Sequence, residues 1–170
     1  MPTYIALLRA VNVGGTGKLP MTELKAMCLA EGFAKVQTYI ASGNVVFFSP
    51  LSAAKAEAAL EKRLQAYAGK PVGVVIRTAQ EMAAVLKSNP FPQSPPNWTV
   101  AIFLDNPPPA DALDNVRGQD NEEVRLGKRE IFVAYGAGIG RSKLKIPAAA
   151  RGTARNINTI AKLVELAADT

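Results

Sequence analysis

The feature that most constrains the fold of this chain is a short apolar segment near its start, Tyr4 to Leu8. The segment holds five apolar residues in succession, and Gly14, Gly15 and Gly17 then interrupt regular structure. It is too short for a buried helix, and as a strand it is apolar on both faces. The sequence therefore predicts a buried strand with other parts of the chain covering each of its faces.

The segments that follow alternate between helical and extended patterns. We expect a helix from about Pro20 to Glu31, a hairpin of strands 36–40 and 45–49, a helix from Ser52 to about Ala68 and a strand at 72–77. The resulting order of strand, helix, strand, strand, helix and strand is that of a ferredoxin-like unit.

The second half of the chain repeats this order without clear sequence identity to the first half. We expect a helix at 79–87, a proline-rich loop at 88–98, a strand at 99–104, a short helix at 110–116, a hairpin of 123–126 with 131–135, a loop at 136–152 and a last helix from about 154 to 168. The sequence thus predicts an α+β protein of two ferredoxin-like (βαββαβ-type) repeats, with antiparallel sheets and helices packed on them. The two halves, 1–78 and 99–170, are joined by 79–98 and are expected to form one compact unit.

Positive charge is concentrated in the C-terminal part. The net charge of +6 at pH 7 arises from residue 125 onward, where nine basic residues stand against three acidic ones. Such a one-sided excess is typical of a surface that binds a polyanion or a phosphorylated partner, or of a solvated basic surface. The chain has no histidine, the commonest general base, and its single cysteine, Cys28, cannot form an internal disulfide.

The apolar runs are far shorter than the roughly 20 residues that cross a bilayer. Residues 1 to 8 lack the basic start of a signal peptide, and Arg9 interrupts the apolar stretch. We therefore expect a cytoplasmic protein without membrane contact, and the sequence suggests neither a metal site nor a cofactor.

Residues 9 to 19, RAVNVGGTGKL, look like the start of a phosphate-binding loop. The loop of nucleoside triphosphatases requires G-x-x-x-x-G-K-[ST], in which the hydroxyl binds magnesium. Here Asn12 stands at the first glycine and Leu19 at the hydroxyl position. The segment is therefore not predicted to be a triphosphatase loop.

Two further patterns are rejected. Ser142 and Lys145 have the spacing of a serine nucleophile with a lysine base, but chance accounts for such a pair in a chain with this many lysines. Tyr4, Phe47 and Phe48 could form the base-stacking sheet of an RNA-recognition domain, but the signature of that domain is absent, so we expect these aromatics in the core.

The remaining polar motifs form a candidate anion site. Its residues are Arg9, Asn12, Gly14, Gly15, Ser42, Gly43, Asn44, Thr153, Arg155 and Asn156. Residues 153–156 are predicted to open the last helix, where free N–H groups favour an anion and Arg9 and Arg155 supply charge. The alternative is that Thr153 only caps this helix and Arg155 pairs with a carboxylate. Arg141, Ser142 and Lys143 form a second basic loop.

Several segments together resemble the bacterial domain-of-unknown-function family 1697 over essentially the whole chain. They are ALLRAVNVGG, TYIASGNVVFF, NPF, SKL and TARNINTIAKL. The resemblance implies an α+β fold of two ferredoxin-like repeats and no established activity. The family's motif positions correspond to Leu8, Arg9, Asn12, Val13, Gly14, Gly15, Thr38, Tyr39, Ser42, Gly43, Asn44, Thr153, Arg155, Asn156 and Thr159. The chain departs from the pattern at Ala10, Ala41 and Ile157.

Three functional hypotheses follow. We expect foremost a binding domain for an anionic ligand, whether a nucleotide, a phosphorylated metabolite or nucleic acid, at the polar site of segments 9–15, 42–44 and 153–156. The alternatives are an enzyme that acts on an anionic substrate without histidine or metal, and a protein-interaction adaptor. Binding is favoured over catalysis because the acidic residues are mostly predicted to lie away from the motifs.

Overall fold

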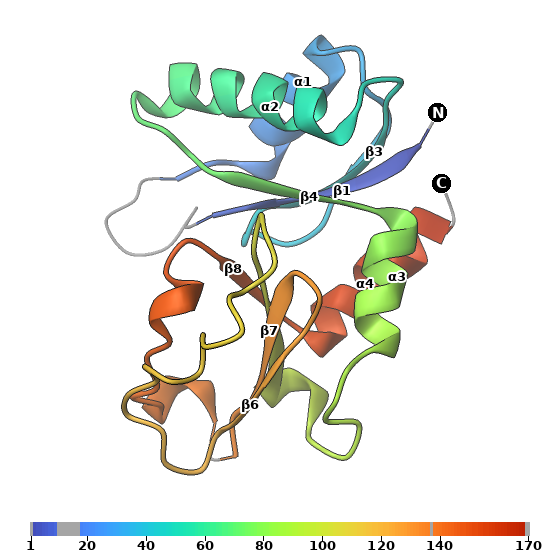
Figure 1. Ribbon diagram of the computed structural model, residues 1–170. Coiled ribbons are helices and arrows are strands. Elements are labelled where there is room, and N and C mark those ends of the chain that lie inside the picture. The colour runs from blue at the N-terminus through green and yellow to red at the C-terminus, as the bar shows by residue number, and fades with distance from the viewer. Residues whose placement is uncertain (1, 10–17, 137, 169–170) are drawn as a thin grey trace. The chain divides into compact units, whose positions relative to one another are not determined.

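The computed structural model describes residues 2–9, 18–136 and 138–168 of the chain. These residues form two compact units. Unit 1 comprises Met1–Ala83 and Lys162–Thr170, and unit 2 comprises Ala84–Ala161. Each unit contains one four-stranded antiparallel sheet (Figure 1). The predicted α+β class is confirmed.

Unit 1 follows the predicted order of elements. They are β1 (Thr3–Leu8), α1 (Met21–Ala30), β2 (Ala34–Thr38), β3 (Asn44–Phe48), α2 (Ala53–Ala68) and β4 (Val74–Thr78). The strands lie in the order β2-β3-β1-β4, the ferredoxin-like arrangement. Ser52 caps α2, where its hydroxyl oxygen accepts a hydrogen bond of 3.3 Å from the Lys55 N–H.

The sheet of unit 1 is buried on both faces, as the apolar pattern of β1 predicts. One face contacts the helices α1 and α2 through Leu24 and Leu60, which are completely buried. Ile5 and Leu7 point to the opposite face and are also 0% exposed. Each such buried side chain stabilises the fold by roughly 1.5–3 kcal/mol.

Tyr4 of β1 and Phe47 of β3 belong to the core beneath the helices, whereas Phe48 is only half-buried. The rings of Phe33 and Phe47 are stacked with their centroids 4.2 Å apart, and the Tyr4 hydroxyl donates to the Leu51 carbonyl. The prediction that these aromatics lie in the core is confirmed for Tyr4 and Phe47. Cys28 lies in the same core, and burial raises the pKa of its thiol to about 12, so that it is protonated and unreactive at neutral pH.

Unit 2 repeats the strand order of unit 1. Its strands are β5 (Thr99–Phe103), β6 (Glu123–Leu126), β7 (Glu130–Ala134) and β8 (Thr153–Asn156). They lie in the order β6-β7-β5-β8, so β5 takes the central place that β1 has in unit 1. The helices α3 (Ala79–Lys87) and α4 (Ile157–Ala168) are each divided between the two units.

Two helix predictions in the second half are wrong. Residues 110–116 form turns, with the N–H groups of Ala112 and Asp114 bonded three residues back to Pro109 and Asp111. Prolines, aspartates and asparagine favour such turns over a helix. The last helix begins at Ile157 instead of about Ala154, because Thr153–Asn156 pairs with β5 as a strand.

The β2–β3 turn also starts earlier than predicted. Ile40, expected at the end of a strand, has φ +52° and is 49% exposed. This left-handed conformation is unfavourable for a β-branched side chain, whereas asparagine adopts it readily. The turn therefore stores strain at an exposed position.

We expect Ile40→Asn to raise the free energy of unfolding by about 1 kcal/mol, because it relieves this strain. Urea unfolding measures the change. Leu29→Asn is the matched control, since Leu29 is an exposed apolar residue in the regular helix α1. An equal effect of both substitutions would show that the gain comes from removing exposed apolar surface and not from the turn.

Candidate functional site

Part of the predicted polar site comes together at the end of β1. The Leu8 N–H donates to the Gly43 carbonyl and the Arg9 N–H to the Gly73 carbonyl, each at 2.9 Å. The Arg9 side chain lies across Gly73, where a Cβ atom would be 2.7 Å from Arg9 Cδ. Arg9 and Gly43 therefore lie at one end of the unit 1 sheet, together with Gly73, which the sequence did not single out.

The polar side chains of the turn at residues 42–44 stabilise the conformation of that turn. Asn44 is completely buried, and its Nδ2 donates to the Tyr39 carbonyl at 2.8 Å and to Ser42 Oγ at 2.9 Å. These bonds fix the shape of the β2–β3 turn, and the Leu8 N–H bond to the Gly43 carbonyl joins the turn to β1. The three other predicted residues of the first segment, Asn12, Gly14 and Gly15, lie outside the described residues.

The prediction that residues 153–156 open a helix is wrong. Thr153 and Arg155 are buried in β8, with Ala154 between them exposed, the alternation of a strand. Asn156 caps α4, since its Oδ1 accepts a bond of 2.8 Å from the Thr159 N–H. The free N–H groups at the start of α4 therefore belong to residues from Ile157 onward, and not to Thr153.

Arg155 is 7% exposed and bonds to its own strand. Its Nη1 donates to Thr153 Oγ1 at 2.6 Å and to the Ala154 carbonyl at 2.9 Å. Burial lowers the pKa of the guanidinium to about 10, so the group is still a cation at neutral pH. Arg9 belongs to unit 1 and Arg155 to unit 2.

An arginine occupies the corresponding place in unit 1. Arg77 on β4 lies opposite Ile5 of the central strand, as Arg155 on β8 lies opposite Ala101. Arg77 is 1% exposed, and its Nη1 donates to the carbonyl of the preceding residue at 3.2 Å, the bond that Arg155 also makes. The shared position favours a structural role for both guanidinium groups.

In the second basic loop, Ser142 joins two segments of unit 2. Its hydroxyl donates to Glu122 Oε2 at 2.8 Å and accepts from the Leu144 N–H at 3.1 Å. The other Glu122 oxygen accepts from the Asp120 N–H at 2.7 Å. The serine that the sequence places beside lysines is thus engaged in holding loop 142–144 against loop 119–122.

The charge of Glu122 is stabilised in this position. The Asp120 N–H and then the Ser142 hydroxyl lower the pKa of its carboxyl below the ordinary value of 4.5. Burial raises the pKa of the nearby Tyr135, and the negative charge of Glu122 raises it further. Glu122 is therefore ionised and Tyr135 neutral at physiological pH.

The same two loops bring basic side chains together. Arg117 and Lys145 exchange two backbone hydrogen bonds, of 2.9 and 2.8 Å, as an antiparallel pair. Directly opposed residues in such a pair project their side chains to the same side. Leu144 and Ile146 pack against the core of unit 2, so the exposed Lys143 and Lys145 lie on the other side of the loop.

Gly118 permits this close crossing of the loops. It has φ +69°, and a Cβ atom there would collide with the Lys143 carbonyl oxygen. Only glycine combines that backbone conformation with that contact. The crossing places Arg117 next to the 141–145 segment, a proximity that no local sequence pattern reveals.

Four exposed cations define what we call the basic surface, namely Arg117, Arg141, Lys143 and Lys145. None of the four makes an ion pair with the residues that the structure describes.

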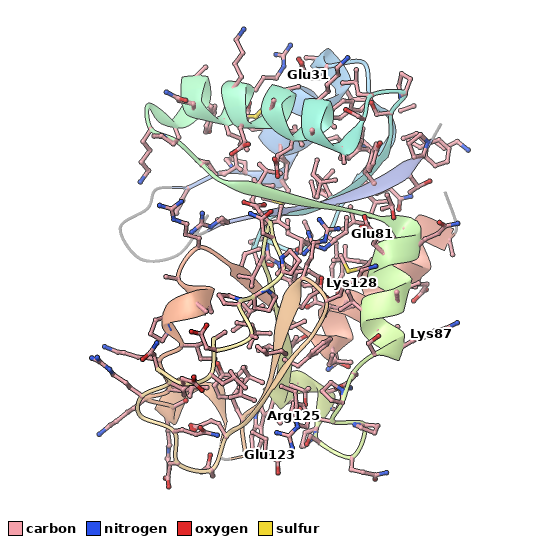
Figure 2. All side chains as sticks on the ribbon, in the orientation of Figure 1. Glu31, Glu81, Lys87, Glu123, Arg125 and Lys128 are labelled. Carbon is pink, nitrogen blue, oxygen red and sulfur yellow. The ribbon has the colours of Figure 1, made fainter. Side chains whose placement is uncertain are left out.

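Other cations in the molecule have partners of their own. In unit 1, Arg63 Nε lies 2.7 Å from Oε2 of Glu31, which Figure 2 labels at the end of α1. In unit 2, the Arg125 guanidinium on the edge strand β6 lies 5.8 Å from the centre of the Phe91 ring (Figure 2). The basic surface differs from other exposed cations, such as Lys25, in that backbone pairing places two of its members, Arg117 and Lys145, directly opposite each other.

Within the described ranges, no group of three or more histidine, cysteine, aspartate or glutamate residues could hold a metal ion. In the same part of the chain, no helix is long and apolar enough to cross a membrane.

Comparison with known proteins identifies the same fold elsewhere. Residues 1–132 match the family model described as "Protein of unknown function (DUF1697)". The structure of the conserved bacterial protein SP0830 from Streptococcus pneumoniae is similar, with a TM-score of 0.80, 25% sequence identity and coverage of 98% of each chain. None of the curated proteins compared with the chain matches it.

The Glu122–Ser142 contact predicts a pH dependence of stability. Because the folded-state pKa of Glu122 is lowered, its stabilisation is fully present above the unfolded-state pKa and is lost as pH falls through the folded-state pKa. We expect Glu122→Gln to be less stable than the wild type at pH 7, with the difference shrinking below about pH 4.5. Urea unfolding from pH 7 to pH 3 measures this, and a difference that does not vary with pH would contradict it.

The buried position of Arg155 predicts a structural effect of its removal. Arg155→Ala takes away the hydrogen bonds to Thr153 Oγ1 and the Ala154 carbonyl and removes a large buried side chain, so we expect a loss of about 2–3 kcal/mol in the free energy of unfolding. Arg151→Ala serves as control because Arg151 is exposed, and its effect should stay within about 0.5 kcal/mol. Similar urea midpoints for the two variants would contradict the structural role.

Proposed function

This chain belongs to the DUF1697 family of proteins of unknown function, and we propose that it is a binding domain for an anionic ligand that is held at the basic surface of unit 2. The ligand is a nucleotide, a phosphorylated metabolite or nucleic acid. Each of these presents phosphate oxygens, which accept charge-assisted hydrogen bonds from lysine and arginine.

The observation that carries the proposal is the direct opposition of Arg117 and Lys145. Like charges that face each other across paired strands destabilise the pair, by an amount of the order of 0.2–1 kcal/mol. A phosphate placed between them converts this repulsion into two attractions. The free protein thus carries an unfavourable arrangement that an anion relieves.

The surroundings of the pair support binding because they fix the cations in place. The backbone bonds between Arg117 and Lys145 set the spacing of their Cα atoms. The Ser142–Glu122 bond anchors the loop between Arg141 and Lys143. A site that is ordered before binding loses less conformational entropy when the ligand arrives.

The carboxylate that is hydrogen-bonded to this loop forms no ion pair with its lysines and arginines, all of which lie in the described part of the chain. Glu122 is 5% exposed, and its two oxygens accept bonds from Asp120 and Ser142. Its carboxylate is engaged in these two bonds, while Arg117, Arg141, Lys143 and Lys145 are exposed. The exposed side chains of segment 141–145 are therefore all cationic.

The other hypotheses stay predictions. The polar site of segments 9–15, 42–44 and 153–156 is supported by the proximity of Arg9 and Gly43, while the burial of Arg155 favours a structural role for that residue. No particular contact among the described residues favours the enzyme or the adaptor over anion binding.

The test is a titration with inorganic polyphosphate, measured by calorimetry at low and at high salt. We expect Lys145→Gln and Arg117→Gln each to weaken binding about tenfold, the effect of losing one charge-assisted contact. We also expect affinity to fall with salt, because counterions compete for the cations.

Lys25→Gln is the matched control. Lys25 is an exposed lysine on α1 of unit 1, so its substitution changes the net charge equally without touching the basic surface. If Lys25→Gln and Lys145→Gln weaken binding to the same degree, the interaction reflects net charge alone and the proposed site is wrong.

A further inference from the structure

We propose that the anionic ligand is single-stranded nucleic acid, with phosphates on the basic surface and a base stacked on Trp98. This inference rests on the proposed function and names the ligand class for it. It is carried by the contacts that connect Trp98 to the loop that bears the cations.

Trp98 is 37% exposed, although tryptophan is among the more buried residue types. Its backbone is fixed, since its N–H donates to the Pro95 carbonyl at 3.0 Å and its carbonyl accepts from the Tyr135 N–H at 2.8 Å. The indole is therefore a partly open aromatic surface on an ordered backbone. Exposed aromatic rings of this kind serve as stacking platforms for unpaired bases.

The indole adjoins the basic loop directly. A Cβ atom on Gly138 would lie 3.6 Å from Cε2 and Cζ2 of Trp98, so Gly138 lies beside the ring. Three residues later the same segment reaches Arg141, and it continues to Lys143 and Lys145. One continuous segment thus borders the aromatic ring and carries three of the four cations.

The combination favours a polymer over a small phosphate. A single phosphate group needs only one or two cations, whereas the four cations of the basic surface extend over two loops. Ile139, which is 43% exposed, stands in the sequence between Gly138 and Arg141 and adds apolar surface for a base or sugar. Alternating phosphates and bases match a surface that offers both charge and aromatic area.

A single strand fits better than a duplex. In a duplex the bases are stacked on each other and cannot reach an aromatic side chain, whereas a single strand leaves them free to stack. The aromatics Tyr4 and Phe47 of the unit 1 sheet are buried in the core and do not provide such a platform. Trp98 therefore takes this role in the proposal.

The chain contains one tryptophan and four tyrosines, so fluorescence excited selectively from tryptophan reports on Trp98 alone. We expect a 12-nucleotide oligouridylate to quench this fluorescence on binding, and inorganic polyphosphate to bind without quenching. If all four cations contact phosphates, the logarithm of the affinity for the oligonucleotide should fall with the logarithm of salt concentration with a slope of about −3.

Substitution separates stacking from charge. We expect Trp98→Leu to weaken oligouridylate binding about tenfold and to leave polyphosphate binding unchanged. The anisotropy of a labelled strand measures oligouridylate binding. Trp98→Phe should retain part of the affinity, which also guards against a folding defect in the leucine variant. Tyr67→Leu is the control, since Tyr67 is a 48% exposed aromatic on α2 of unit 1.

The outcomes distinguish this inference from the proposed function. Suppose that Lys145→Gln weakens the binding of both probes equally, that the oligonucleotide does not quench the fluorescence, and that Trp98→Leu does not change its affinity. Anion binding then stands and the nucleic-acid proposal is wrong. The same holds if a duplex of equal length binds more tightly than the single strand. If Lys145→Gln changes the binding of neither probe, both proposals fail.

Discussion

The rest of this structure depends on one requirement, that a strand buried on both faces must find hydrogen-bond partners for its backbone along both edges. In unit 1, β1 meets this requirement by pairing with β3 on one edge and β4 on the other. In unit 2, β5 pairs in the same way with β7 and β8. Strands distant in sequence are thereby joined to a central strand, and the loops at its ends are brought together.

Unit 1 was predictable because its signals are local. The apolar run of β1, the cap at Ser52 and the turn cluster at 42–44 each identify an element within a few residues. Unit 2 is harder to predict because the described segments between its strands form turns and loops where the repeat suggests helices. The charge and the capping residues of Thr153–Asn156 also favour a helix start over the strand that the structure has. The repeat itself requires a fourth strand beside β5, and the alternating burial of Thr153 and Arg155 belongs to that strand.

The sequence predicts the chemical character of the candidate site but not its position. The sequence shows that positive charge gathers toward the C-terminal part, but not that Arg155 points into the protein while Arg117 faces solvent. The opposition of Arg117 and Lys145 depends on a loop crossing at Gly118, between residues far apart in the chain. The proximity of Arg117 and Lys145 follows from tertiary structure and cannot be predicted from local sequence motifs.

The division of α3 and α4 between the two units has a consequence for how the protein is made. The chain leaves unit 1 after Ala83, builds unit 2, and contributes to unit 1 again from Lys162 onward. During synthesis from the N-terminus, unit 1 therefore lacks a part of itself until unit 2 has been translated. Neither unit corresponds to a fragment that can be excised by a single cut in a linker, since both boundaries fall within helices. In its connectivity, unit 2 is an insertion into unit 1.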